Sequence, residues 1–106
     1  LSRLLDQYPN LMLDISWRIL DDYYFSKSEN QDQYVAFMNH YSERILPGSD
    51  FVAFRNNTFK TYQQELEVTG RIHKYLSDKA FRNIALGQNY FTLLNLDYQA
   101  PEMCQK

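Results

Sequence analysis

Acidic and hydroxyl side chains stand at the ends of two short apolar runs. The first run, LMLDIS at 11–16, carries Asp14 and Ser16, and the second, ILPGSD at 45–50, ends on Asp50. A carboxylate at the end of a strand can hold a divalent metal ion or accept a proton from an attacking water, and the glycine two positions earlier leaves room for an ion or a backbone to approach. The alternative for Asp50 is a turn or helix-capping aspartate after a strand.

Three further side chains follow these runs closely enough to touch a bound substrate. Trp17 and Arg18 would lie in the loop after the first run, and Arg55 lies in the polar loop after the second. Binding residues concentrate on such loops, although a packed tryptophan, solvated arginines and a plain surface loop are the alternatives. All three remain candidate substrate contacts.

Both runs have the properties of short strands. In the first, the apolar residues at odd positions from Leu11 to Ile15 alternate with Met12, Asp14 and Ser16, which is the period of a strand with one buried face. We expect the odd positions to pack against helices and the even positions to face the other side. In the second run a proline removes a ladder donor, so it should lie at a bulge or at the end of the strand.

Helices are predicted around and between these strands. Helical spacing of apolar residues indicates helices over 1–8, 18–26 and 34–41. Two more are expected within 60–96, the last region, and the apolar stripe of the second runs from Ala80 to Phe91. Ser77 is a good N-cap for the second helix of that last region. The tail at 97–106 is expected to be irregular and exposed.

This order of elements predicts an α/β fold. An apolar strand, a helix, a second strand and a long helical region make one repeat and a half of a (β/α) barrel. A complete barrel needs roughly 250 residues, whereas the chain has 106. We therefore expect residues 1–106 to be a segment of such a domain.

Composition argues against several classes of partner. The net charge is −2 and the basic residues are scattered, so nucleic acid is not an expected partner. No stretch approaches the roughly 20 apolar residues that cross a bilayer, and no basic-then-apolar leader opens the sequence. With Cys104 as a single cysteine, we expect a cytoplasmic protein without membrane contact. Aromatic residues make up 16% of the chain, and aromatic surface left exposed would favour association between copies of the chain, so a homo-oligomer is an open alternative.

Three blocks of the sequence resemble a known family. They are YPNLMLDIS at 8–16, RILPGSD at 44–50 and IALGQN at 84–89, in this order. Together they resemble the C-terminal part of the amidohydrolase superfamily, in its branch of amidohydrolase-related, metal-dependent hydrolases with a TIM-barrel fold. The resemblance implies an α/β fold in which the chain is the C-terminal portion of a (β/α)8 barrel. The first two blocks would be its last two strands, and the third would lie in a final helix.

The resemblance also implies roles for individual residues. The family's aspartate at the end of the eighth strand binds the catalytic divalent ion and accepts a proton from the attacking water, and by position it matches Asp50. Zinc is the expected ion, with manganese or iron as alternatives. The family's other ligands are histidines on earlier strands, beginning with a His-x-His pair. Because His40 and His73 fall in predicted helices, the remainder of the barrel would have to supply those ligands.

The positions of Asp14 and Ser16 suggest a supporting role in such a site. Polar groups beside a metal ligand orient it through hydrogen bonds. The alternative for Asp14 is a carboxylate that only hydrogen-bonds a neighbouring strand.

Two classes of function follow. The first is part of a metal-dependent hydrolase, in which a metal-bound water attacks a carbonyl of a small-molecule substrate, or part of a decarboxylase with the same barrel. The chain alone is then expected to be inactive, because one carboxylate does not complete a catalytic metal site. The second is a noncatalytic α/β or helical interaction module, since a fold does not fix a function.

Overall fold

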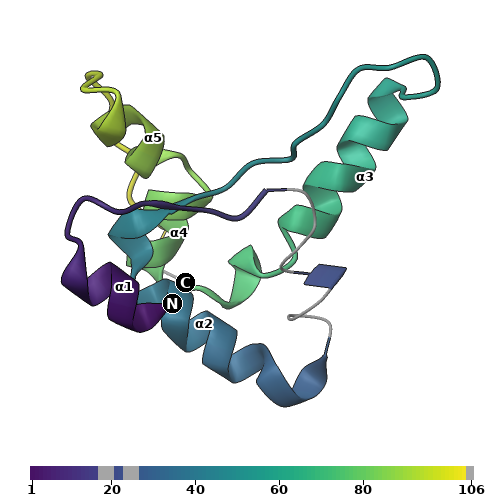
Figure 1. Cartoon of the computed structure of the whole chain (residues 1–106). Coiled ribbons are helices and arrows are strands. Elements are labelled where there is room, and N and C mark those ends of the chain that lie inside the picture. Colours follow the sequence, from purple (N-terminus) through teal and green to yellow (C-terminus); the bar gives the residue numbers. More distant parts are fainter. Residues whose placement is uncertain (17–20, 23–26, 105–106) are drawn as a thin grey trace.

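The computed structural model describes residues 1–16, 21–22 and 27–104 (Figure 1). Trp17, Arg18 and most of the helix expected over 18–26 lie outside the described residues. Within the described residues the elements in chain order are α1 (Ser2–Gln7), β1 (Leu13–Asp14), η2 (Ser28–Asn30), α2 (Gln31–His40), η3 (Ser42–Arg44), β2 (Ile45–Leu46), α3 (Phe59–Thr69), η4 (His73–Tyr75), α4 (Asp78–Ile84) and α5 (Gln88–Leu93).

The two strands form a small parallel sheet. Leu13 lies opposite Ile45 and Asp14 opposite Leu46, and the N–H of Ile15 donates to the carbonyl of Leu46 at 3.1 Å. The described part of the chain is therefore helix-rich with a two-stranded parallel sheet, which is compatible with a segment of an α/β fold. Parallel strands need a crossover connection, and the segment that contains α2 supplies it here.

The hydrophobic core joins α2, β2 and the helical region after α3. Met38, Ile45, Ile72, Ala80 and Ile84 are each at most 2% exposed and form one cluster. Partly buried residues in or directly after β1 and α2 pack against this cluster. Leu13, Ile15, Tyr34, Phe37 and Tyr41 do so as the two sequence periods predict, and Val35 and Leu76 join them. Burial of this cluster fixes both strands against α2 and α4.

Predicted and observed helices agree in the middle of the chain and differ at their ends. The helix expected over 34–41 begins earlier, at Gln31, and Asn30 occupies its N-cap position without a side-chain hydrogen bond. At α4 the side chain of Ser77 accepts from the N–H of Ala80 at 3.3 Å, as predicted for an N-cap. Helix α3 begins with a reciprocal cap between Thr58 and Thr61.

The apolar pattern expected to make one helix from 80 to 91 spans two. Gly87 has φ = 80° and separates α4 from α5. This left-handed conformation is accessible to glycine without steric cost, so the helix breaks here although the apolar spacing continues. The break turns the first residues of α5 towards β2.

The C-terminal segment is irregular but partly packed. Residues 97–104 have no regular secondary structure, yet Ala100 is only 2% exposed. Its carbonyl accepts from Arg82 at 2.7 Å and its N–H donates to Gln88 at 2.7 Å. The ring of Tyr98 stacks on Phe91 at 4.1 Å between centroids. The expectation of an exposed tail is therefore wrong for Tyr98 and Ala100, although Gln99 between them is exposed.

No helix in the described ranges has both the length and the apolar character that crossing a membrane requires.

Truncating the core should unfold the chain more readily. Ile84 is fully buried, so Ile84→Ala removes apolar contacts and leaves a cavity, and we expect it to lower the free energy of unfolding by about 2–5 kcal/mol. Leu94→Ala is the matched control, because Leu94 is 63% exposed, and its effect should stay within about 0.5 kcal/mol. Urea unfolding of both variants measures this, and equal losses would contradict the assigned core.

Candidate functional site

The C-terminal end of β1 carries a fixed carboxylate. An Oδ atom of Asp14 accepts from the backbone N–H of Ser16 at 2.7 Å. This local bond holds the carboxylate over the strand end, while the Asp14 side chain stays exposed. Because Leu13 and Ile15 pack into the core, Asp14 and Ser16 face the other side, as the strand period predicts.

The end of β2 meets the end of β1 at Gly48. A Cβ placed on Gly48 would lie 2.3 Å from the hydroxyl oxygen of Ser16 and 3.4 Å from its Cβ. The missing side chain thus accommodates Ser16 of the neighbouring strand end. The sequence suggested that this glycine makes room for an ion or a backbone, and the structure gives the space to a hydroxyl group.

Asp50 lies beyond the strand. Strand β2 ends at Leu46, so the alternation of strand faces does not extend to Asp50. Its backbone has φ = 51°, a left-handed conformation that aspartate, asparagine and glycine tolerate best. The side chain is exposed, and its carboxylate accepts no hydrogen bond from the described residues. Its oxygens are therefore open to a ligand.

Sequence reasoning missed Tyr90, which joins this site from α5. Its hydroxyl donates to the carbonyl of Pro47 and lies 3.9 Å from the position that a Gly48 Cβ would take. Partial burial, and secondly the negative charge of Asp14, raise the pKa of the Tyr90 phenol, so it remains a donor through neutral pH. The position of Tyr90 directly after the IALGQN block is the sequence feature that could have pointed to it, although the sequence does not show which atom its hydroxyl reaches.

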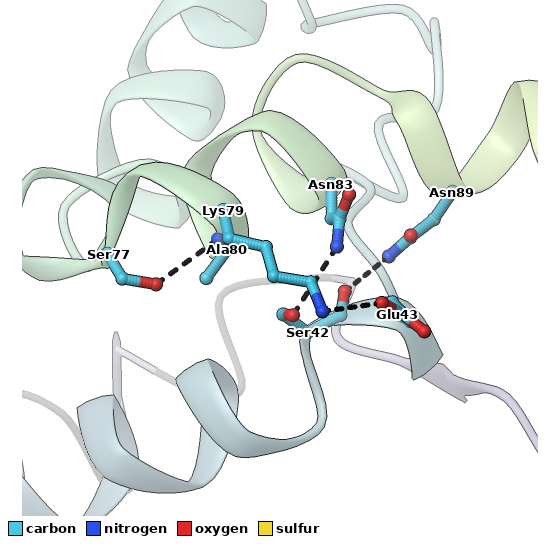
Figure 2. A network of polar contacts seen from close by, with 7 residues as sticks. All are labelled: Ser42, Glu43, Ser77, Lys79, Ala80, Asn83 and Asn89. Atoms are coloured by element: carbon cyan, nitrogen blue, oxygen red, sulfur yellow. Dashed lines mark hydrogen bonds and ion pairs between the residues drawn. The ribbon is translucent and has the colours of Figure 1, made fainter. Parts of the chain in front are cut away.

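Asn89, one residue earlier, fixes the start of β2 from a buried position. Its side chain is 5% exposed, and its amide nitrogen donates to the carbonyls of Ser42 and Ile45, each at 2.7 Å. Figure 2 shows the surrounding network, in which Asn83 donates to the Ser42 hydroxyl at 3.3 Å. Helices α4 and α5 thereby hold η3 and β2 in place.

Arg44 links the N-terminal ends of the two strands. Its guanidinium donates to the carbonyl of Leu11 through Nε at 2.8 Å and to that of Tyr8 through Nη2 at 2.6 Å. These charge-assisted bonds link the last residue of η3 to the chain that enters β1. The strand pair is thus held at its entry by Arg44 and at its exit by the Ser16–Gly48 contact.

Of the remaining sequence candidates, the structure describes only Arg55. Arg55 belongs to the exposed stretch 52–60, and the segment that contains it runs outward from the strands to α3 (Figure 1). Trp17 and Arg18, which directly follow Ser16, are not among the described residues. The structure therefore brings together Asp14 and Ser16 with the chain that leads to Asp50, and places Arg55 apart from them.

Both histidines lie in or at helical segments away from the strand ends. His40 is exposed at the end of α2 and contacts Tyr41 edge-on at 4.5 Å between ring centroids. His73 lies in η4, with its ring edge-on to Phe81 at 6.4 Å. Among the described residues, no three His, Cys, Asp or Glu side chains form a group that could hold a metal ion.

A scan against protein-family models finds no match, and neither a search of curated proteins nor one of solved structures finds one.

Removing the Asn89 amide should destabilise the chain strongly. Asn89→Ala leaves two backbone carbonyls without their donor, and we expect a loss of about 2–3 kcal/mol in the free energy of unfolding. Asn83→Ala is the matched control, because Asn83 makes a single, longer bond to a hydroxyl that can turn to another partner. Its loss should stay below about 1 kcal/mol. Chemical denaturation compares the two, and an equal or larger loss for Asn83→Ala would contradict the assignment.

His73 should make stability depend on pH. Burial lowers the pKa of His73 from the usual 6.5, so the folded state favours the neutral imidazole. Its contribution is complete above about pH 6.5, the unfolded-state pKa, and is lost as the pH falls through the lowered folded-state pKa.

Denaturation between about pH 7 and 5 measures this effect. His73→Gln should flatten the pH dependence, whereas His40→Gln, which changes an exposed ring, should retain the wild-type slope. The same slope in His73→Gln as in wild type would refute this role.

Proposed function

We propose that the chain contributes the strand-end site of a metal-dependent hydrolase with a (β/α)8 barrel, as its last two strands and their helices. One observation carries this proposal. Two parallel strands in register bring Asp14 and Ser16 to the same edge as Gly48 and the chain that leads to Asp50. In barrel enzymes the chemistry lies at this C-terminal edge of the strands.

The open shape of the chain supports a larger assembly. Its accessible surface is 7981 Å², whereas a compact protein of 12.7 kDa exposes about 6,200 Å². An apolar groove of about 470 Å³ runs along β1 between α1 and α2, lined by residues that include Leu1, Leu13, Ile15 and Phe37. A two-stranded sheet is marginal alone, and this groove offers apolar surface beside its β1 edge.

Asp50 fits the role of one metal ligand. Its carboxylate is exposed and accepts no hydrogen bond from the described residues, and a single carboxylate oxygen suits zinc, manganese or iron. A bound divalent ion would supply a water of lowered pKa for attack on a substrate carbonyl. Asp50 would accept the proton of that water, while Asp14 and Ser16 line the edge beside it. The other ligands have to come from outside the described residues.

The same site suits the loss of a carboxylate from a small-molecule substrate, which is the decarboxylase alternative. Asp50 would again hold the ion, but no water would be consumed. The nature of the product distinguishes the two reactions.

An interaction module is the second candidate function, and the chain's apolar surface favours it. Val52 and Phe54, on the segment that extends from β2 to α3 (Figure 1), are 63% and 68% exposed, and Phe59, the first residue of α3, is 78% exposed. Exposed apolar residues grouped in this way mark contact surfaces. A protein partner would then cover them, and the strand ends would carry no chemistry.

Native mass spectrometry of the protein as purified distinguishes these functions. The hydrolase proposal expects a divalent ion in a particle heavier than the 12.7 kDa of this chain. Asp50→Asn should lose the ion while keeping the fold, because asparagine tolerates the left-handed backbone as well as aspartate does. Asp97→Asn, at another exposed aspartate, should retain it. A wild-type particle heavier than this chain that holds no metal ion, or an ion that survives Asp50→Asn, would refute the metal role of Asp50.

A further inference from the structure

Three successive backbone carbonyls at the C-terminal end of β2 accept hydrogen bonds from groups on both edges of the strand. The carbonyl of Ile45 accepts from Asn89, that of Leu46 from the N–H of Ile15, and that of Pro47 from the hydroxyl of Tyr90. Carbonyls of successive residues in an extended strand point to opposite edges. Strand β1 therefore binds one edge, and the two side chains of α5 bind the other.

Tyr90 is the last of these contacts before the chain leaves the sheet. Pro47 follows directly after β2 and has no N–H of its own, so its carbonyl is its only backbone hydrogen-bonding group. The residues from Gly48 to Asp50 come next, and Asp50 turns into its left-handed conformation without a hydrogen bond from the described residues to its side chain. The direction in which this segment departs is thus set at Pro47.

The Tyr90 hydroxyl also lies close to the other strand end. It is 3.9 Å from the position that a Cβ on Gly48 would take, and that position is 2.3 Å from the hydroxyl oxygen of Ser16. One phenol on α5 therefore adjoins the point where the ends of β1 and β2 meet.

We propose that Tyr90 is a positioning residue of the strand-end site: its bond to the Pro47 carbonyl fixes the exit of β2, so that the Gly48–Asp50 segment presents Asp50 beside Asp14. This role rests on the function proposed above for Asp50. The bond itself can be tested without any metal ion, so failure of the positioning role and failure of the metal role are separable.

Selective carbon-13 labelling of proline carbonyls reports on the bond directly. The chain has three prolines, Pro9, Pro47 and Pro101, so the labelled protein gives three carbonyl signals. Tyr90→Phe keeps the ring and removes the donor, and it should shift the Pro47 signal alone. Tyr98→Phe is the matched control, because Tyr98 also donates its hydroxyl to a backbone carbonyl, that of Leu86, at 3.0 Å. An unshifted Pro47 signal in Tyr90→Phe would overturn the proposal.

Amide hydrogen exchange then measures how firmly the segment after Pro47 is held in its position. Loss of the Tyr90 bond should speed exchange about fivefold at Phe51, whose N–H donates to the Ser49 hydroxyl at 3.2 Å, with Ile45 and Ile84 unchanged. Tyr98→Phe should leave all of these amides unchanged. Exchange that is unaltered at Phe51, or accelerated equally throughout the core, would show that Tyr90 does not position this segment.

Zinc binding completes the test, measured on the particle heavier than this chain that native mass spectrometry identifies, because the described residues hold no complete set of metal ligands. If Asp50 is a ligand, Tyr90→Phe should weaken zinc binding about fivefold, and Tyr98→Phe should not weaken it. Zinc binding that is lost in Asp50→Asn but unchanged in Tyr90→Phe would overturn the positioning role and leave the metal role intact. A heavier wild-type particle that binds no zinc, together with the carbonyl shift and faster exchange in Tyr90→Phe, would refute the metal role and support the hold of Tyr90 on the segment.

Discussion

The buried side-chain amide of Asn89, in α5, binds two backbone carbonyls that lie more than forty residues earlier in the chain. Its two bonds reach the carbonyls of Ser42 and Ile45, which are the first residues of η3 and of β2. Buried carbonyls without a donor are costly, so these bonds constrain where β2 begins. Once β2 is placed, β1 pairs with it, and the core residues of α2 and α4 close on the pair.

The strand-end site inherits its geometry from this constraint. Helix α5 follows the left-handed Gly87 and so presents Asn89 and Tyr90, in sequence, to the same edge of β2. The side chains of α5 occupy that edge at Ile45 and Pro47, whereas the groove along β1 lies open.

The sequence predicts the elements that depend on local patterns. The alternation around Leu13, the helical stripe at Met38 and the cap at Ser77 all depend on neighbours a few residues away, and the structure contains each of them. The contacts that shape the site are different in kind. Asn89 and Tyr90 reach partners more than forty residues away, and a helical pattern shows that they lie on a helix without showing which carbonyl they bind.

Other features of the site escape the sequence for similar reasons. The apolar spacing continues across Gly87, so periodicity alone does not reveal the break that aims α5. The proline explains why β2 ends before Asp50, but no sequence pattern shows the left-handed backbone (φ = 51°) that Asp50 then adopts. The packing of Ala100 against Arg82 and Gln88 arises from side chains that bind its backbone, which composition does not predict.

The strand-end site depends on the contact between the C-terminal ends of β1 and β2, and a proton–proton nuclear Overhauser measurement detects this contact. The Cβ of Ser16 lies 3.4 Å from the position that a Cβ on Gly48 would take. A cross-peak is therefore expected between the β-protons of Ser16 and the α-protons of Gly48. If that cross-peak is absent while Ile45 and Ile84 still show their core contacts, the strand ends do not meet and the site as described does not exist.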